Sequence, residues 1–297
     1  MKPVKTWAAC FALFATMPLM ASAQDETTEA VITAEMAAAD PDTWRQADPE
    51  NIIIFRTTSG RVVIEMLPEV APSHATQFRT LVRSGDYDGT SFHRVIQGFM
   101  AQGGDIFALK GRESGLPNIP GEFTFRRTPE DMPMDAFGEP DISMDGYIKG
   151  FPIKTQAAWI AEMSSDGLIE SYIPHCASVV STARTSDPDS ANSQFFLMRG
   201  RAEHLDRGYT AWGRIIDGQD AVMSIKLGEP PAVPDILQRA VMAADIPEAE
   251  RPAIYVMRTD SDVFQARLAA AGVSIATDVC DVDPVPAIVE YPVTAEN

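Results

Sequence analysis

The chain has 297 residues, a hydrophobic content of 45% and a formal net charge of −18. This length and composition allow one large domain or two small ones with a sizeable core. The acidic balance argues against nucleic-acid binding, which needs a basic surface, and against electrostatic docking on an anionic membrane.

The first 23 residues have the pattern of an export signal. Lys2 and Lys5 give a positive start, residues 7–20 are almost wholly apolar, and three small residues at 21–23 form a cleavage site. We therefore expect a signal peptide over 1–23, a periplasmic or secreted mature protein, and no membrane association after cleavage. The apolar run is too short to span a bilayer well, and a retained anchor is the alternative.

The mature chain keeps two cysteines, and its four histidines are scattered in sequence. An exported protein can join Cys176 and Cys280 by a disulfide, and two free thiols are the alternative; the sequence leaves both open. No cysteine pair or His/Cys cluster has metal-ligand spacing, so we expect neither a metal nor a cofactor.

Residues 24–50 are rich in Ala, Glu, Thr and Asp and have few core-forming side chains. A short helix over 33–39 is possible, but the composition predicts a flexible tether. Regular structure begins with IIIFRT (52–57), a Thr-Ser-Gly turn and RVVIEM (61–66), which predict a β-hairpin.

An amphipathic helix follows over 73–84, because apolar residues recur there at helical spacing, Pro72 precedes the run and Gly85 ends it. The next stretch, FHRVIQGFMAQGGD (92–105), places Arg94 among apolar side chains. A charged guanidinium is rarely buried without a task, although a strand whose arginine extends to solvent is an equally simple explanation. Residues 106–121 predict a loop and 121–125 a short strand.

Residues 126–172 have no sustained periodicity, and Pro, Gly, acidic residues and methionines punctuate them. One or two helical turns are possible over 155–163. We interpret the segment as an insertion, since long irregular segments within domains are usually functional or disordered. Met132, Met134 and Met144 are either an adaptable contact surface or part of a loosely packed flap.

Regular structure returns with strands over 176–183, 194–199, 209–217 and 239–245, a turn-rich loop over 183–193, a short turn or helix over 202–206 and a helix over 218–228. Many short strands, two helices and no βαβ repetition favour a closed antiparallel barrel over a parallel sheet. Residues 246–297 form a C-terminal extension with a strand over 254–259, a helix over 262–272 and an acidic, Pro-rich end.

Four stretches, in this order, resemble the cyclophilin-type peptidyl-prolyl cis/trans isomerases: GRVVIEMLPEVAPSHATQF, FHRVIQGFMAQGGD, ARTSDPDSANSQFFL and HLDRGYTAWGRIIDG. The resemblance covers roughly 51–125 and 173–245. It implies a mainly β fold, a closed eight-stranded antiparallel barrel capped by two α-helices. The isomerase domain would span 51–245, with 126–172 as an insertion.

The resemblance also implies roles for individual residues. Arg94 matches the family's catalytic arginine, and Gln102 is expected to act with it. Residues matching the walls of the proline pocket or contacts to the substrate backbone are His93, Phe99, Met100, Ala183, Gln194, Phe196, His204, Leu205 and Tyr209.

Four departures from the family pattern stand out. Gln97 replaces the usual proline in its turn, and Tyr209 replaces a common histidine. His204 stands where many eukaryotic members carry a tryptophan that binds cyclosporin, so we expect weak cyclosporin binding. The loop 183–193 has about one extra residue, which leaves Arg184 open as a peptide contact.

Isomerisation of an X-Pro bond needs no nucleophile, base or metal, because the enzyme has only to favour the twisted amide over both planar forms. The sequence therefore predicts an exported, monomeric prolyl isomerase that assists folding, with proline-containing polypeptides as substrates. A module that binds proline-bearing segments and a holdase chaperone, which would need an exposed apolar patch, are the alternatives.

Overall fold

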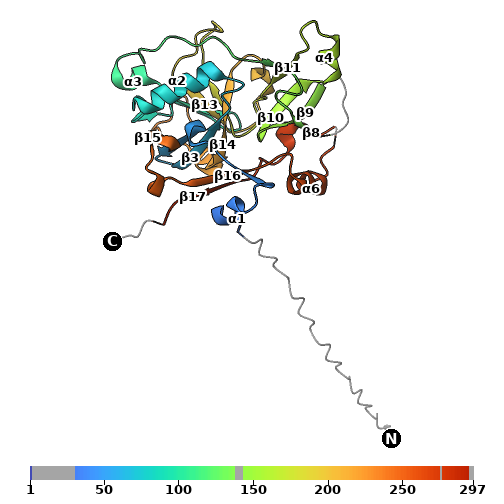
Figure 1. The fold of residues 1–297 in the computed structure, drawn as a ribbon. Helices are drawn as coiled ribbons and strands as arrows, with labels where there is room; N and C mark the ends of the chain where they lie inside the picture. Colours follow the sequence, from blue (N-terminus) through green and yellow to red (C-terminus); the bar gives the residue numbers. More distant parts are fainter. Residues whose placement is uncertain (2–30, 138–142, 275, 294–297) are drawn as a thin grey trace. The chain divides into compact units, whose positions relative to one another are not determined.

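The computed structural model describes residue 1 and residues 31–137, 143–274 and 276–293. The chain divides into two compact units, Met1–Val31 and Ile32–Asn297, and all helices and strands named below belong to the second (Figure 1). Apart from Met1, the expected signal peptide (1–23) lies outside the described residues. Within the described ranges, no helix is long and apolar enough to cross a membrane.

The main sheet has nine antiparallel strands in the order β4-β15-β2-β3-β14-β12-β13-β6-β5. Their bounds, in chain order, are β2 Ile52–Thr57, β3 Gly60–Met66, β4 Thr90–Ser91, β5 Arg94–Ile96, β6 Met100–Gly103, β12 Val179–Thr182, β13 Phe195–Met198, β14 Ala211–Asp217 and β15 Ile236–Met242. The strands expected over 52–57, 61–66, 176–183, 194–199, 209–217 and 239–245 are thus confirmed within a few residues at each end.

The expectation of a closed eight-stranded barrel is wrong, because the sheet is a curled half-barrel whose edges are β4 and β5. Only Phe92 and His93 separate these two edge strands. The amide of Phe92 donates to Asp235 beside one edge (2.9 Å), and that of His93 donates to Gln102 beside the other (3.0 Å). The chain itself therefore crosses from edge to edge, and no ladder of hydrogen bonds joins β4 to β5.

The two predicted helices of this domain are α2 (Pro72–Arg83) and α5 (Gln219–Ser224). α2 begins at Pro72 and buries the side chains whose spacing predicted it, among them Phe78 and Leu81. α5 ends four residues earlier than expected, because the following residues turn away and Gly228 bridges to Val95. The other α-helices are α1 (Ala34–Ala38), α3 (Ile106–Lys110), α4 (Trp159–Met163) and α6 (Asp262–Ala270).

The core under α2 is aromatic. The ring of Phe78 stacks on that of Trp212 with centroids 4.2 Å apart, and Phe195 lies 5.1 Å from Phe55. All four side chains are fully buried, and burial of each contributes roughly 1.5–3 kcal/mol to stability. This core supports β13 and therefore fixes the strand that carries Phe196.

Residues 125–172 form a separate five-stranded antiparallel sheet in the order β7-β11-β10-β9-β8 (Figure 1). The strands are β7 Phe125–Arg127, β8 Asp135–Ala136, β9 Ser143–Ile148, β10 Phe151–Gln156 and β11 Ile169–Tyr172. Lys149 and Gly150, both with positive φ, turn the β9–β10 hairpin, as two-residue hairpin loops require. Since Phe151 and Ile153 are fully buried, the interpretation of a loosely packed flap is wrong.

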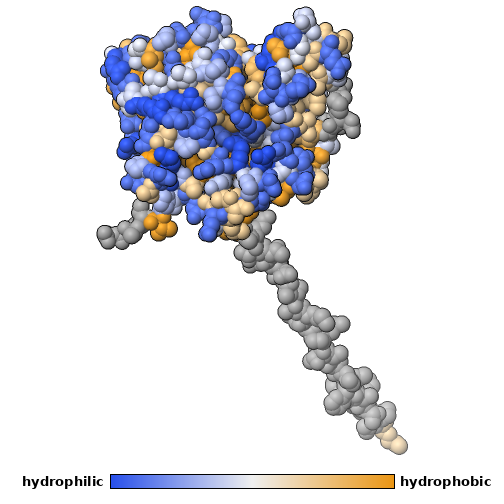
Figure 2. Space-filling model, in the orientation of Figure 1, coloured by the Kyte–Doolittle hydropathy of each residue, from blue (hydrophilic) through white to orange (hydrophobic). Residues whose placement is uncertain are grey.

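A third sheet joins the two ends of the described chain. It has the order β1-β16-β17, with β1 Trp44–Gln46, β16 Ala253–Met257 and β17 Ala287–Glu290. Part of the segment expected as a tether, 24–50, is therefore paired with the C-terminal extension, where the strand predicted over 254–259 and the helix over 262–272 correspond to β16 and α6. The face in Figure 2 is mostly hydrophilic, in keeping with the net charge of −18.

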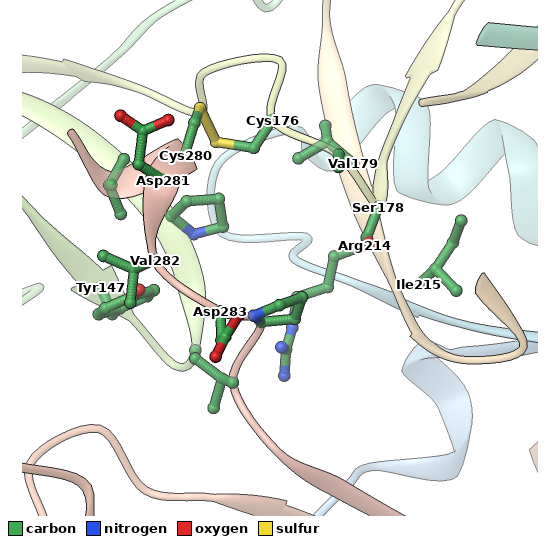
Figure 3. Close-up of a pocket in the computed structure, with 16 residues that line it drawn as sticks. Tyr147, Cys176, Ser178, Val179, Arg214, Ile215, Cys280, Asp281, Val282 and Asp283 are labelled. Atoms are coloured by element: carbon green, nitrogen blue, oxygen red, sulfur yellow. A yellow bond between two sulfur atoms is a disulfide. The ribbon is translucent and has the colours of Figure 1, made fainter. Parts of the chain in front are cut away.

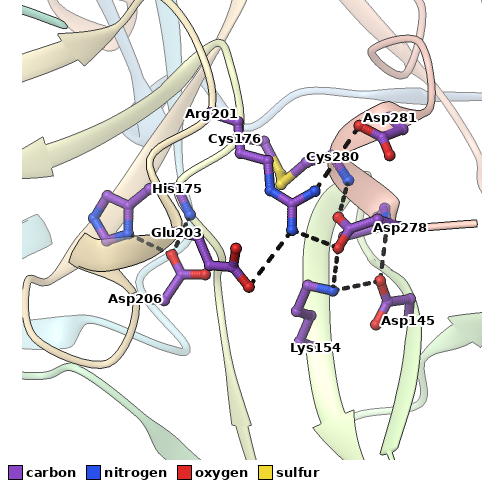
Figure 4. Close-up of a disulfide and its surroundings, with 11 residues drawn as sticks. Asp145, Lys154, His175, Cys176, Arg201, Glu203, Asp206, Asp278, Cys280 and Asp281 are labelled. Atoms are coloured by element: carbon purple, nitrogen blue, oxygen red, sulfur yellow. Dashed lines mark hydrogen bonds and ion pairs between the residues drawn. A yellow bond between two sulfur atoms is a disulfide. The ribbon is translucent and has the colours of Figure 1, made fainter. Parts of the chain in front are cut away.

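Cys176 and Cys280 form a disulfide (Figure 4). Of the two alternatives that the sequence left open, a disulfide or two free thiols, the structure has the disulfide. An ion network surrounds it: Asp278 accepts from Lys154 of β10 (2.8 Å) and from Arg201 (2.7 Å). The disulfide attaches the C-terminal extension to Cys176, just before β12. The ion network attaches it to β10 of the inserted sheet and to Arg201, just after β13.

Candidate active site

Three side chains lie in a row across neighbouring strands of the main sheet. Arg94 of β5 pairs with Gln102 of β6, and Gln102 pairs with Phe196 of β13. Directly opposed residues of antiparallel strands project from the same face. The turn that contains Gln97 closes the β5–β6 hairpin without disturbing this register. The fold thus brings a guanidinium, an amide and an aromatic ring together from segments up to about a hundred residues apart.

The polar part of the site centres on two glutamines. The side-chain nitrogen of Gln102 donates to the side-chain oxygen of Gln194 at 2.9 Å. The backbone carbonyl of Gln194 accepts from the amide of Ala183 at 2.9 Å. Each amide side chain is only partly buried and therefore keeps hydrogen-bonding capacity for a peptide backbone.

The apolar part combines buried and half-buried side chains. Phe196 and Leu205 are 4% and 7% exposed, and Met100, buried at the start of β6, lies opposite Met198 of β13. The rings of Phe99 and His204 lie 5.4 Å apart, and Tyr209 meets Phe196 edge to face at 6.0 Å. Because His204 is exposed, its imidazole is at the rim.

Two residues that the sequence suggested for the site, His93 and Arg184, lie apart from the row of Arg94, Gln102 and Phe196. His93 lies between the two sheet edges, and its Nδ1 atom is buried without a hydrogen-bond partner among the described residues. Arg184, left open by the sequence, donates through Nε to the carbonyl of Gly208 at 2.9 Å and lies 4.4 Å from the Tyr209 ring. Arg184 therefore belongs to the rim of the same site.

Sequence reasoning missed His175. Its imidazole is buried, lies stacked 6.1 Å from the Phe196 ring, and shares a 2.9 Å hydrogen bond between Nδ1 and the Asp206 carboxylate. Asp206 also accepts from the His175 amide at 2.7 Å. The His175–Asp206 pair supports the apolar wall through the contact of His175 with Phe196. Sequence spacing gave no sign of this pair, because its two residues are 31 positions apart.

A pocket of about 500 Å³ opens beside the two glutamines. Its lining includes Gln102, Ala183 and Gln194 from the candidate set, together with Arg184, Asp105 and Phe107. The pocket thus lies next to Gln102 and Gln194, and Arg94 is not part of its lining.

A second pocket, of about 220 Å³, lies where the main sheet, the inserted sheet and the C-terminal extension meet (Figure 3). None of the candidate site residues lines it. Arg214 at its wall is buried and donates through Nη2 to Glu65 at 3.0 Å, and Glu65 also pairs with Arg45 at 2.7 Å. Burial alone would raise the pKa of Glu65, but Arg214 and Arg45 lower it, so the carboxylate stays ionised.

Within the described ranges, no three His, Cys, Asp or Glu side chains are grouped to hold a metal ion. The candidate site itself combines hydrogen-bonding side chains with an apolar wall. The model of the family described as "Cyclophilin type peptidyl-prolyl cis-trans isomerase/CLD" matches residues 52–242. The chain belongs to this cyclophilin family. The enzyme is a peptidyl-prolyl cis-trans isomerase.

Individual cyclophilins agree with this assignment. A "Probable peptidyl-prolyl cis-trans isomerase" of Brucella suis is 35% identical over 204 residues, which cover 67% of this chain and 86% of that protein. A Streptomyces antibioticus "Peptidyl-prolyl cis-trans isomerase cyp18" is 33% identical over 180 residues, or 58% of this chain and 81% of that protein.

The crystal structure of the cyclophilin AquaCyp293 from Hirschia baltica superposes with a TM-score of 0.85 at 47% identity. It covers 88% of this chain and 99% of its own. The similarity therefore extends beyond residues 52–242, into parts of the chain outside the family match.

Proposed function

We propose that this cyclophilin is exported and assists the folding of exported proteins, with Arg94 as the group that stabilises the twisted prolyl amide. The observation that supports the role of Arg94 is the row Arg94–Gln102–Phe196 across β5, β6 and β13. It combines a donor, an amide that can bind a peptide backbone and an apolar wall on one face of the sheet.

The barrier to X-Pro rotation, about 18–20 kcal/mol, comes from amide resonance. In the twisted amide the prolyl nitrogen regains its lone pair, so a donor aimed at that nitrogen binds the transition state more tightly than either planar form. A guanidinium suits this role because it is always charged and offers several donors. The substrate contributes all covalent chemistry, and the enzyme contributes positioning and charge.

The remaining residues hold the peptide. Phe99, Phe196 and Leu205 enclose the proline ring, while Gln102 and Gln194 bind the backbone beside it. The 500 Å³ pocket next to the glutamines accepts a neighbouring substrate side chain. The ring is thereby held while the preceding carbonyl rotates.

Arg94→Ala tests the mechanism in a protease-coupled assay on a proline-containing peptide. We expect kcat/KM to fall on the order of 10²–10³, the loss typical of removing one preorganised donor. Arg83→Ala is the matched control: Arg83 has a similarly exposed side chain (39% against 41%) and also pairs with glutamate, but it lies on α2. Full activity of Arg94→Ala would refute the mechanism.

The same variant separates the alternatives. A binding module predicts that wild type and Arg94→Ala bind a proline peptide equally and that neither catalyses measurably. A holdase predicts that Arg94→Ala suppresses aggregation of an unfolded client as well as wild type does.

Export is supported by the signal pattern in residues 1–23 and by the Cys176–Cys280 disulfide, since disulfides persist in oxidising compartments. Fusing residues 1–30 to a reporter that is active only after export tests this. We expect an active, processed reporter with cleavage after Ala23. An uncleaved or inactive fusion would contradict export.

A further inference from the structure

The guanidinium of Arg94 has a carboxylate partner that the sequence did not indicate. Its Nε atom donates to Oε2 of Glu229 at 2.7 Å, across 135 positions of sequence. Both side chains are partly exposed, 41% for Arg94 and 54% for Glu229. Among the described residues, the two terminal nitrogens of Arg94 have no acceptor within hydrogen-bond distance. Glu229 thus occupies one edge of the guanidinium and leaves the other edge free.

The backbone places Glu229 opposite Arg94. Val95 and Gly228 form an antiparallel bridge with reciprocal amide bonds of 2.8 and 3.0 Å. In an antiparallel pair the residue before one partner faces the residue after the other, so Arg94 and Glu229 are the next opposed pair. The contact is therefore set by strand register.

The loop that carries Glu229 is fastened at both ends. The carboxylate of Asp235, 2% exposed, accepts from the amide of Lys226 at 2.9 Å and from the hydroxyl of Thr58 at 2.7 Å. These bonds tie residues 226–235 to the β2–β3 turn. Glu229 consequently has a fixed position relative to β5, as a residue that orients another side chain must.

An arginine side chain with 41% exposure has several free torsions, and ordering them costs up to about 2 kcal/mol of entropy. Misplacement of a catalytic group by a fraction of its length lowers the rate steeply. A carboxylate bound at Nε restricts these torsions before substrate arrives. Because the pair is solvent-exposed, the attraction is screened and the guanidinium keeps most of its donor strength.

We propose that Glu229 is a positioning residue: it holds Nε of Arg94 so that the terminal nitrogens stay directed at the prolyl amide. The inference rests on the proposed role of Arg94. Glu229 itself touches no substrate and acts only through the arginine.

Glu229→Ala and Glu229→Gln form the test. We expect Glu229→Ala to lower kcat/KM roughly three- to five-fold, the ratio that one exposed ion pair contributes, with the loss in kcat rather than KM. Glu229→Gln should stay within about two-fold of wild type, because its amide oxygen also accepts from Nε. Glu50→Ala is the matched control, since Glu50 is 52% exposed and pairs with Arg83 on α2.

A double-mutant cycle isolates the pathway. In the Arg94→Ala background, Glu229→Ala should have no further effect. The inference fails if Glu229→Ala is as active as wild type, if it is faster, or if its effect persists without Arg94. If Arg94→Ala itself retains full activity, the mechanism fails as a whole. If Arg94→Ala is inactive and Glu229→Ala is unimpaired, only the positioning role fails.

Discussion

Removing the Cys176–Cys280 disulfide should destabilise the protein without abolishing activity. The bond closes a chain segment of 104 residues, and the loop-entropy relation gives about 4.7 kcal/mol for a loop of that size. The ion network around Asp278 still holds the C-terminal extension to Lys154 and Arg201 when the bond is absent. The double variant Cys176→Ser/Cys280→Ser should therefore fold, with a free energy of unfolding lowered by roughly 3–5 kcal/mol.

Urea titration and thermal unfolding measure this loss, which corresponds to a fall in Tm on the order of 10 °C for a domain of this size. The control is a reducing agent: it should lower the Tm of wild type towards that of the double variant and leave the variant unchanged. Prolyl isomerase activity should change less than about three-fold, because His175 keeps both of its hydrogen bonds to Asp206. A double variant within 1 kcal/mol of oxidised wild type would refute the entropic argument.

Two further predictions concern buried carboxylates. Glu65→Gln leaves the buried Arg214 without a countercharge and should lower the free energy of unfolding in urea by roughly 3–5 kcal/mol. The control Glu50→Gln, in an exposed pair, should lower it by about 0–1 kcal/mol. Equal losses for the two variants would contradict the argument from burial. Burial alone would raise the pKa of Asp235, but hydrogen bonds from Thr58 and Lys226 lower it to about 2 from 3.8. Its stabilisation, roughly 2 kcal/mol, is therefore complete above pH 4 and lost as the pH falls towards 2. Asp235→Asn should flatten this part of the stability–pH curve, and an unchanged curve would contradict the assignment.

The sequence predicted the family, the β2–β3 hairpin and helix α2, because each depends on local pattern. The continuous apolar runs of β2 and β3, which are buried along most of their length, and the helical spacing of Ala75, Phe78 and Leu81 are properties of short windows. Arg94 stood out for a related reason, since a charge in an apolar window is visible without knowing the fold. Its opposition to Gln102 follows from a hairpin closed within a few residues.

The inserted sheet escaped prediction because its strands are short and their order does not follow the sequence. β7 pairs with β11 rather than with its neighbour β8, so its apolar pattern depends on a partner more than forty residues away. The prediction of a closed barrel was wrong for a similar reason. Whether the two edges join depends on the hydrogen bonds of Phe92 to Asp235, just before β15, and of His93 to Gln102 of β6, and no property of Phe92 or His93 alone indicates these partners.

Glu229 shows where sequence reasoning reaches its limit at the site itself. An exposed glutamate in a Pro-rich loop has no intrinsic mark of function, and its neighbours predict only a turn. It acquires a role through the Val95–Gly228 bridge, which fixes its register against Arg94. The bridge depends in turn on Asp235, whose buried bonds shape the loop. A weakening of those bonds at Asp235 should therefore reach Arg94, the arginine proposed to act on the prolyl amide, through Glu229.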